Sequence, residues 1–178
     1  KTGMKLRNVS GSICSKCYAL KGRYVFPNVK NALIRRFNKI SDPMWVDAMT
    51  IAIGGTESSG FFRWHDSGDI QSLKHLTDIC QIAKNLSNIS FWLPTREYSI
   101  VAQYVKQNGA LPENLTVRLS ALMINGQPPV SIANRLGCVT SGVSDIGFTC
   151  PSSAQGNKCL NCRACWDKNV TNVNYKTH

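Results

Sequence analysis

Eight cysteines carry the most evident chemistry in this chain, and four of them lie close together near the C-terminus. Cys159, Cys162 and Cys165 are spaced C-x2-C-x2-C, and Cys150 comes just before a proline. Thiolates are soft ligands for zinc and iron–sulfur clusters, and three sulfurs around one small turn suit three corners of a cubane. The bacterial ferredoxin pattern joins the same run to a remote Cys-Pro, which there follows the run. We therefore predict a [4Fe–4S] cluster bound by these four cysteines.

The cysteines also allow other sites. Zinc could use the same thiols, or could include Cys14 and Cys17, which form a C-x2-C knuckle near the start. This pair could instead complete an iron–sulfur site in place of a C-terminal ligand, or act as a redox pair. Disulfides are a further alternative, but the opening residues lack the apolar run of an export signal. Cys80 and Cys138 lie in apolar runs, so we expect them to be buried side chains and not ligands.

A second group of polar side chains follows two segments that resemble strands. His65 and Asp66 could act as general acid and base or bind a hard cation. Arg96 and Glu97 could bind and orient an anionic ligand. The alternatives are structural: Asp66 closes a turn, Asp69 caps the next helix, and Arg96 with Glu97 forms a local ion pair. We expect His65 to be functional and Asp69 to be a cap.

The pattern of apolar residues predicts two helices followed by alternating strands and helices. Asp42 is expected to be the N-cap of the second helix, with Pro43 at its first position, and Gly54 and Gly55 are expected to end it. The expected helices cover residues 27–40, 42–53, 71–86, 98–107 and 130–136, and the expected strands cover 61–65, 89–93, 115–122 and 137–141.

This alternation favours an α/β fold with a mostly parallel sheet. A complete eightfold barrel needs about 250 residues, so the 178 residues here predict an open sheet or a partial βα barrel. We expect one domain over 1–178, with a βα core at 1–148 and an irregular, cysteine-rich segment at 149–178 docked on it. That segment is poor in apolar residues, so docking or a bound metal must order it. Ligands of such sheets bind past the carboxyl ends of the strands.

The formal net charge of +11 favours polyanionic partners, so nucleic acid is one expected partner. The basic residues are spread along the chain, however, which is equally typical of a general basic surface. A redox partner or a small-molecule ligand at the carboxyl ends of the strands is the other expectation. No stretch of about 18 apolar residues is present, so we expect no membrane contact. The lack of an export signal favours a reducing compartment, the cytoplasm, where cysteine clusters usually serve in metal binding or catalysis.

Four segments, in order along the chain, resemble the phage gene product 88 family. They are GSICSKCYALKGRYVFPNV, FFRWHDSGDIQS, FWLPTREY and GNKCLNCRACWD. The resemblance implies a bacteriophage or prophage origin, and hence the cytoplasm of a bacterial host. It implies no defined reaction.

A cysteine knuckle before a series of βα units is also similar to proteins related to radical S-adenosylmethionine enzymes. Those proteins hold their cluster with C-x3-C-x2-C, whereas this chain has only the C-x2-C of Cys14 and Cys17, with Ser10 at the first position. Two hypotheses result. The chain is an iron–sulfur protein, redox-active or structural, or it is a zinc-stabilised basic module that binds nucleic acid or a host protein.

Overall fold

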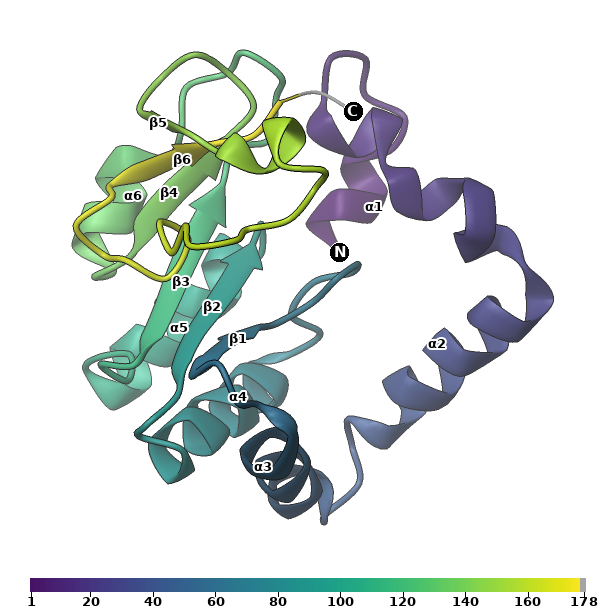
Figure 1. Cartoon of the computed structure of the whole chain (residues 1–178), viewed down its shortest axis with the longest axis vertical. Helices are drawn as coiled ribbons and strands as arrows, with labels where there is room; N and C mark the ends of the chain where they lie inside the picture. Colours follow the sequence, from purple (N-terminus) through teal and green to yellow (C-terminus); the bar gives the residue numbers. More distant parts are fainter. Residues whose placement is uncertain (177–178) are drawn as a thin grey trace.

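The structure, a computed structural model, describes residues 1–176 and has a single sheet at its centre (Figure 1). Six parallel strands follow the order β1-β2-β3-β4-β6-β5, and the sheet is open and strongly curled, like half of a βα barrel. The predicted α/β fold with an open parallel sheet is therefore confirmed. The strands are β1 (Phe61–Arg63), β2 (Ser90–Thr95), β3 (Leu115–Ser120), β4 (Val139–Gly142), β5 (Phe148–Thr149) and β6 (Asn172–Asn174).

Helices cover one face of this sheet and enclose the main core. Along β3, Leu115, Val117 and Leu119 point to this side and are at most 2% exposed. They pack among apolar side chains of the helices that connect the strands, as parallel crossovers require. The helices are α1 (Thr2–Leu6), α2 (Pro27–Lys39), α3 (Trp45–Thr56), α4 (Leu73–Asn85), α5 (Tyr98–Asn108) and α6 (Val130–Arg135).

The cysteine-rich stretch covers the opposite face of the sheet. It is the crossover that leads from β5 to β6, residues 150–171, and we call it the cysteine crossover. A second, smaller core lies beneath it and includes Trp92 of β2, Val173 of β6 and Cys165. The C-terminal segment therefore completes the sheet in addition to docking on it, and β5 and β6 were absent from the predicted elements. Residues 177 and 178 of the predicted segment lie outside the described residues.

Two predicted helix boundaries are wrong. Asp42 is not the N-cap of α3, because the helix begins at Trp45 and Met44 is its N-cap. The Asp42 carboxylate instead accepts from the Met44 N–H in the preceding turn and pairs with Lys39 at 2.9 Å. Gly54 does not end α3, which continues through both glycines to Thr56. A side chain at position 54 would lie 3.1 Å from Leu86, so this glycine lets α3 approach the chain just after α4.

Helix α2 stands apart from the layered core. It forms an arm, at the right in Figure 1, between the N-terminal segment and α3. Pro27 occupies the first turn as predicted, yet α2 buries none of its residues. The apolar face of this helix, with Val29, Leu33 and Phe37, therefore lacks the core contact that such a face normally makes.

Candidate functional site

The carboxyl ends of β1 and β2 are joined through the carboxylate of Asp69. One carboxylate oxygen accepts from the Thr95 hydroxyl at 2.6 Å and from the Ile70 N–H at 2.8 Å, and the other accepts from the Arg96 N–H at 2.8 Å. Burial raises the pKa of this carboxyl, and the hydrogen bonds oppose that effect. The prediction that Asp69 caps the next helix is wrong: Ser72 caps α4 by accepting from the His75 N–H.

His65 lies past the end of β1 in an unusual environment. Its backbone is left-handed, with φ of 59°, which is uncommon for a residue other than glycine. Its ring lies 5.6 Å from that of His75 on α4, and its Nδ1 atom is buried without a hydrogen-bond partner among residues 1–176. Burial, helped by the charge of Arg63, lowers the pKa of His65 to about 4. Burial likewise lowers the pKa of His75 to about 4, so both imidazoles are neutral at pH 7.

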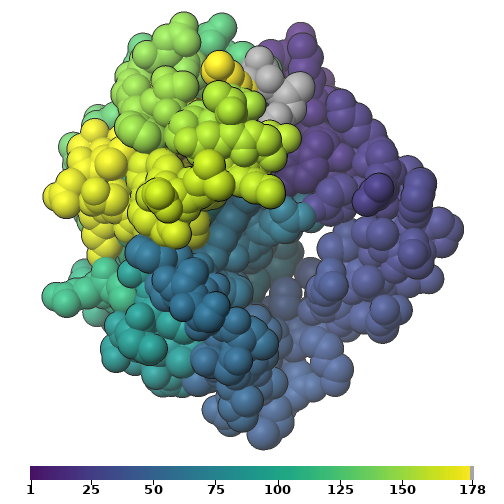
Figure 2. All heavy atoms as spheres, viewed as in Figure 1, coloured from purple at the N-terminus to yellow at the C-terminus, as the bar shows by residue number. Residues whose placement is uncertain are grey.

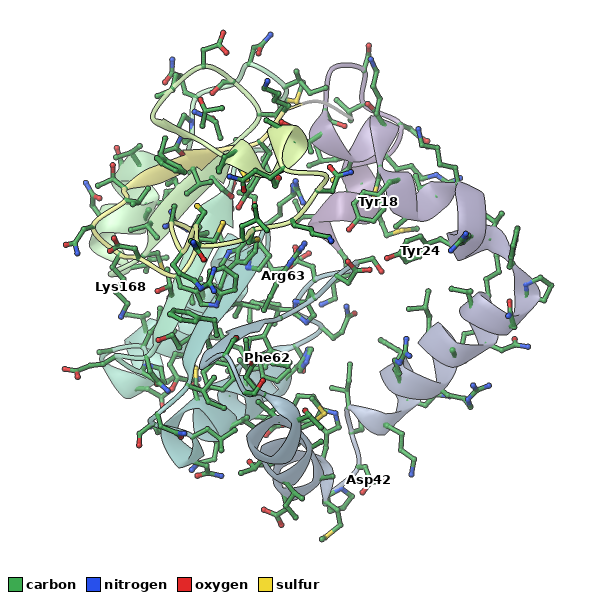
Figure 3. All side chains as sticks on the ribbon, viewed as in Figure 1. Tyr18, Tyr24, Asp42, Phe62, Arg63 and Lys168 are labelled. Carbon is green, nitrogen blue, oxygen red and sulfur yellow. The ribbon has the colours of Figure 1, made fainter. Side chains whose placement is uncertain are left out.

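The other predicted candidates near His65 have structural partners. Asp66 is exposed and accepts hydrogen bonds from two tyrosines of the N-terminal segment, which are labelled in Figure 3. The Tyr18 hydroxyl donates to the backbone carbonyl of Asp66, and the Tyr24 hydroxyl donates to its carboxylate. The buried carboxylate of Glu97 accepts from the Thr2 N–H at 2.7 Å. Both residues thus fasten the N-terminal segment to the sheet.

Arg96 makes no ion pair with Glu97 in the part of the chain that the structure describes. Its Nε atom is buried without a partner among those residues, and its charge acts on Cys14. The alternative in which Arg96 and Glu97 form a local ion pair is therefore wrong. The guanidinium remains available to an anion.

Cys14 and Cys17 lie past the carboxyl end of β3. The N–H of Ile13 donates to the carbonyl of Leu122 at 3.0 Å, which holds their short turn, Ile13–Lys16, against the chain that leaves β3. Burial raises the pKa of Cys14, while the charge of Arg96 lowers it. The two thiols are neighbours, and the charges acting on Cys14 belong to Arg96, Cys17 and Asp69. Cys14 and Cys17 therefore lie with Asp69 and Arg96 at the carboxyl ends of the strands, and we call these four residues the strand-end group. The pair is not part of the cysteine crossover.

The four C-terminal thiols differ in exposure. Cys165 is 7% exposed, and its Sγ lies 3.2 Å from the Tyr175 hydroxyl. Burial raises its pKa to about 11, with further upward contributions from Cys150 and Cys159, so these three thiols are close enough to interact. Cys159 is exposed and Cys162 half-buried, and the Cys162 N–H donates to the Cys159 carbonyl at 2.9 Å.

All eight cysteines are free thiols. Within residues 1–176, no three Cys, His, Asp or Glu side chains converge closely enough to hold a metal ion. Cys80 and Cys138 are buried, as predicted.

Arg118 organises the cysteine crossover, and sequence reasoning missed it. Its side chain rises from the middle of β3, is completely buried, and donates from all three of its nitrogens. Its acceptors are five backbone carbonyls at 2.6–3.0 Å, those of Thr140, Ala164, Cys165, Asp167 and Val170. Burial lowers the pKa of Arg118 from its usual value. The available signal was an arginine in the apolar run LTVRLSAL.

The family model described as gene product 88 matches residues 8–168. The chain belongs to the gene product 88 family. The predicted resemblance is thus confirmed. No curated protein and no solved structure matches the chain significantly. The gene product 88 match includes the strand-end group, Arg118 and all four crossover thiols. Over residues 1–176, each helix of this gene product 88 protein is too short or too polar to cross a bilayer.

Proposed function

We propose that this protein is an iron–sulfur protein, phage-encoded and acting in the cytoplasm of its bacterial host. Its [4Fe–4S] cluster would be held by the thiolates of Cys150, Cys159, Cys162 and Cys165. When bound, such a cluster accepts and donates single electrons or serves as a structural crosslink. The free state of every cysteine in the chain fits a reducing compartment.

The buried charge of Arg118 carries this proposal. Among residues 1–176 it has no carboxylate partner, since the two salt bridges there join Lys39 to Asp42 and Lys74 to Asp78. A buried cation without a counterion is costly, and carbonyl dipoles compensate it only in part. A cluster ligated by four thiolates is anionic, so it would supply the missing countercharge beside Cys165.

Four thiolates are suitable ligands for a [4Fe–4S] cluster. The exposed part of the cysteine crossover also has room to close around one. Residues 156–161, which carry Cys159, are all exposed. Leu160 lies in this turn with φ of 45°, a value that leucine rarely adopts, and its side chain is 58% exposed. Movement of this exposed turn would carry Cys159 toward Cys165 and bring the thiols together.

Metal analysis tests the proposal. We expect protein purified without oxygen to be brown and to contain about four iron and four sulfide per chain, as the cluster type requires. The variant Cys162→Ser is expected to lose this iron, because an alkoxide is a poor substitute for a soft thiolate. Its cysteine crossover should also become sensitive to protease. Cys162 is only half-buried, so the substitution should not disturb the core.

Two variants control for the ligand set. Cys80→Ala removes a buried thiol of α4 and is expected to leave iron and sulfide unchanged. The double variant Cys14→Ser/Cys17→Ser should also retain iron, since this pair lies in the strand-end group. Loss of iron in either variant would show that the ligand set is wrong.

If the purified protein is instead colourless and contains nearly one zinc per chain, the cysteines form a structural zinc site and not an iron–sulfur cluster. The protein would then be the zinc-stabilised basic module, and duplex DNA would be its first test ligand. Arg35, Arg36 and Lys39 are exposed together on α2, which favours such binding. A plot of the logarithm of the binding constant against the logarithm of the salt concentration should then have a slope of about −0.9 for each DNA phosphate that the protein neutralises.

A further inference from the structure

A cavity of about 930 Å³ separates the α2 arm from the body of the protein, within the size range of ligand pockets. Figure 2 shows it as an opening between the α2 arm and the rest of the chain. One wall is the apolar face of α2, with Val29, Leu33 and Phe37. Phe37 is 57% exposed, so protein alone does not cover this face. The space suits a flat apolar group.

The opposite wall holds polar atoms that lack partners. Trp64 and His65 both line the cavity, and Trp64 Nε1 and His65 Nδ1 are each buried without a hydrogen bond to any of residues 1–176. Buried polar atoms of this kind normally have a partner. His65 is also held in the left-handed conformation, and such backbone outliers gather at functional sites. Trp45 and His75 complete a ring-lined wall opposite the apolar face of α2.

The charged side chains that line the cavity indicate which class of ligand it binds. Four cationic side chains line the cavity, those of Arg23, Arg35, Arg36 and Lys39. Two carboxylates line it as well, those of Asp66 and Asp69. Both carboxylates already accept hydrogen bonds from protein groups. Lys39 pairs with Asp42, and the three arginines make no salt bridge within the described part of the chain. Guanidinium groups match phosphate oxygens with paired donors, so the free arginines favour a phosphorylated ligand.

We propose that this cavity binds a nucleoside phosphate. The base would lie between the apolar face of α2 and the ring-lined wall, and the phosphates would meet the arginines of the arm. The sugar or base would provide the partners that Trp64 and His65 lack. None of the cysteines lines the cavity, so this site is independent of the proposed cluster.

Titration with ADP, followed by tryptophan fluorescence and calorimetry at low salt, tests this site in the full chain. We expect saturable binding of one ADP per chain, with adenosine and inorganic phosphate each weaker by at least about tenfold, the loss of one good set of contacts. Arg36→Gln should weaken ADP by about tenfold and leave adenosine unchanged, since it removes one charged contact. Phe37→Ser should weaken ADP and adenosine alike.

The matched control is Arg135→Gln, which removes an exposed arginine from the last turn of α6, away from the cavity. It should leave ADP affinity unchanged. An equal loss in Arg36→Gln and Arg135→Gln would mean that only net charge attracts ADP and would overturn the site, as would a lack of saturable ADP binding by the unmodified chain. Cys162→Ser should bind ADP normally, so failure of this site and failure of the cluster are distinguishable.

Discussion

Replacement of Arg118 with methionine is expected to lower the free energy of unfolding by on the order of 4 kcal/mol, because it deprives buried carbonyls of their donors. Five carbonyls lose their hydrogen bonds, and four of them belong to the cysteine crossover. Methionine fills much of the space but donates no hydrogen bond. The crossover should then separate from the sheet. Urea unfolding measures the stability, and hydrogen exchange over 150–171 measures the release of the crossover.

Arg118→Lys keeps the charge but offers three donors in place of the five N–H groups of arginine. It should lose less stability and retain part of the protection, which keeps the test informative if Arg118→Met does not fold. Arg135→Met is the matched control on the exposed end of α6 and should change stability by less than about 0.5 kcal/mol. Unchanged protection of the crossover in Arg118→Met would show that Arg118 does not organise it.

The parts of the fold that sequence predicted are those with strong apolar periodicity. Strand β3 has an apolar residue at every second position, although all six of its residues are buried, and helix α4 buries apolar residues at helical spacing. Both elements were predicted within three residues of their ends. The short strands β5 and β6 could not be predicted in this way, because FT and NVN carry too few apolar residues. Their pairing depends on neighbours far along the chain, such as the Cys150 N–H that donates to the Asn174 carbonyl at 2.8 Å.

The sequence predicted which residues lie at the candidate site but not which side chains contact one another there. His65 was placed correctly at the end of a strand, whereas its neighbour His75, an ordinary polar residue in the helical pattern, carried no signal. Asp69 could cap a helix or join two strand ends, and it is the parallel pairing of β1 with β2 that brings Thr95 and Arg96 to it. Such pairings depend on tertiary geometry, which local spacing does not specify.

The neutral histidines give the second large expected effect, a loss of stability on acidification. In the folded chain His65 and His75 have pKa values of about 4, against about 6.5 when unfolded. Between these values the unfolded chain binds more protons, so the free energy of unfolding falls as the pH falls. Each histidine makes its full contribution to the free energy of unfolding above pH 6.5. As the pH approaches 4, roughly 3 kcal/mol of that free energy is lost for each histidine.

Comparison with His75→Gln isolates one of the two groups. Glutamine does not titrate, and its amide oxygen can replace Nδ1 as acceptor for the Gln71 N–H. We expect urea unfolding to show a smaller loss of stability between pH 6.5 and 4.5 in this variant, by up to about 1.4 kcal/mol per pH unit. Burial raises the pKa of Asp69, which acts in the opposite direction in both proteins and therefore cancels in the comparison.

Thr77→Gln places the same side chain on the exposed face of α4, two residues from His75, and should keep the full pH dependence of the unmodified protein. If His75→Gln lost stability on acidification as steeply as Thr77→Gln, then His75 would be protonated in the folded chain near its ordinary pKa. The ring-lined wall would then carry positive charge at mildly acid pH. A smaller loss in His75→Gln alone would establish that the wall beside His65 is neutral, so that the arginines of the arm supply the charge that an anionic ligand meets.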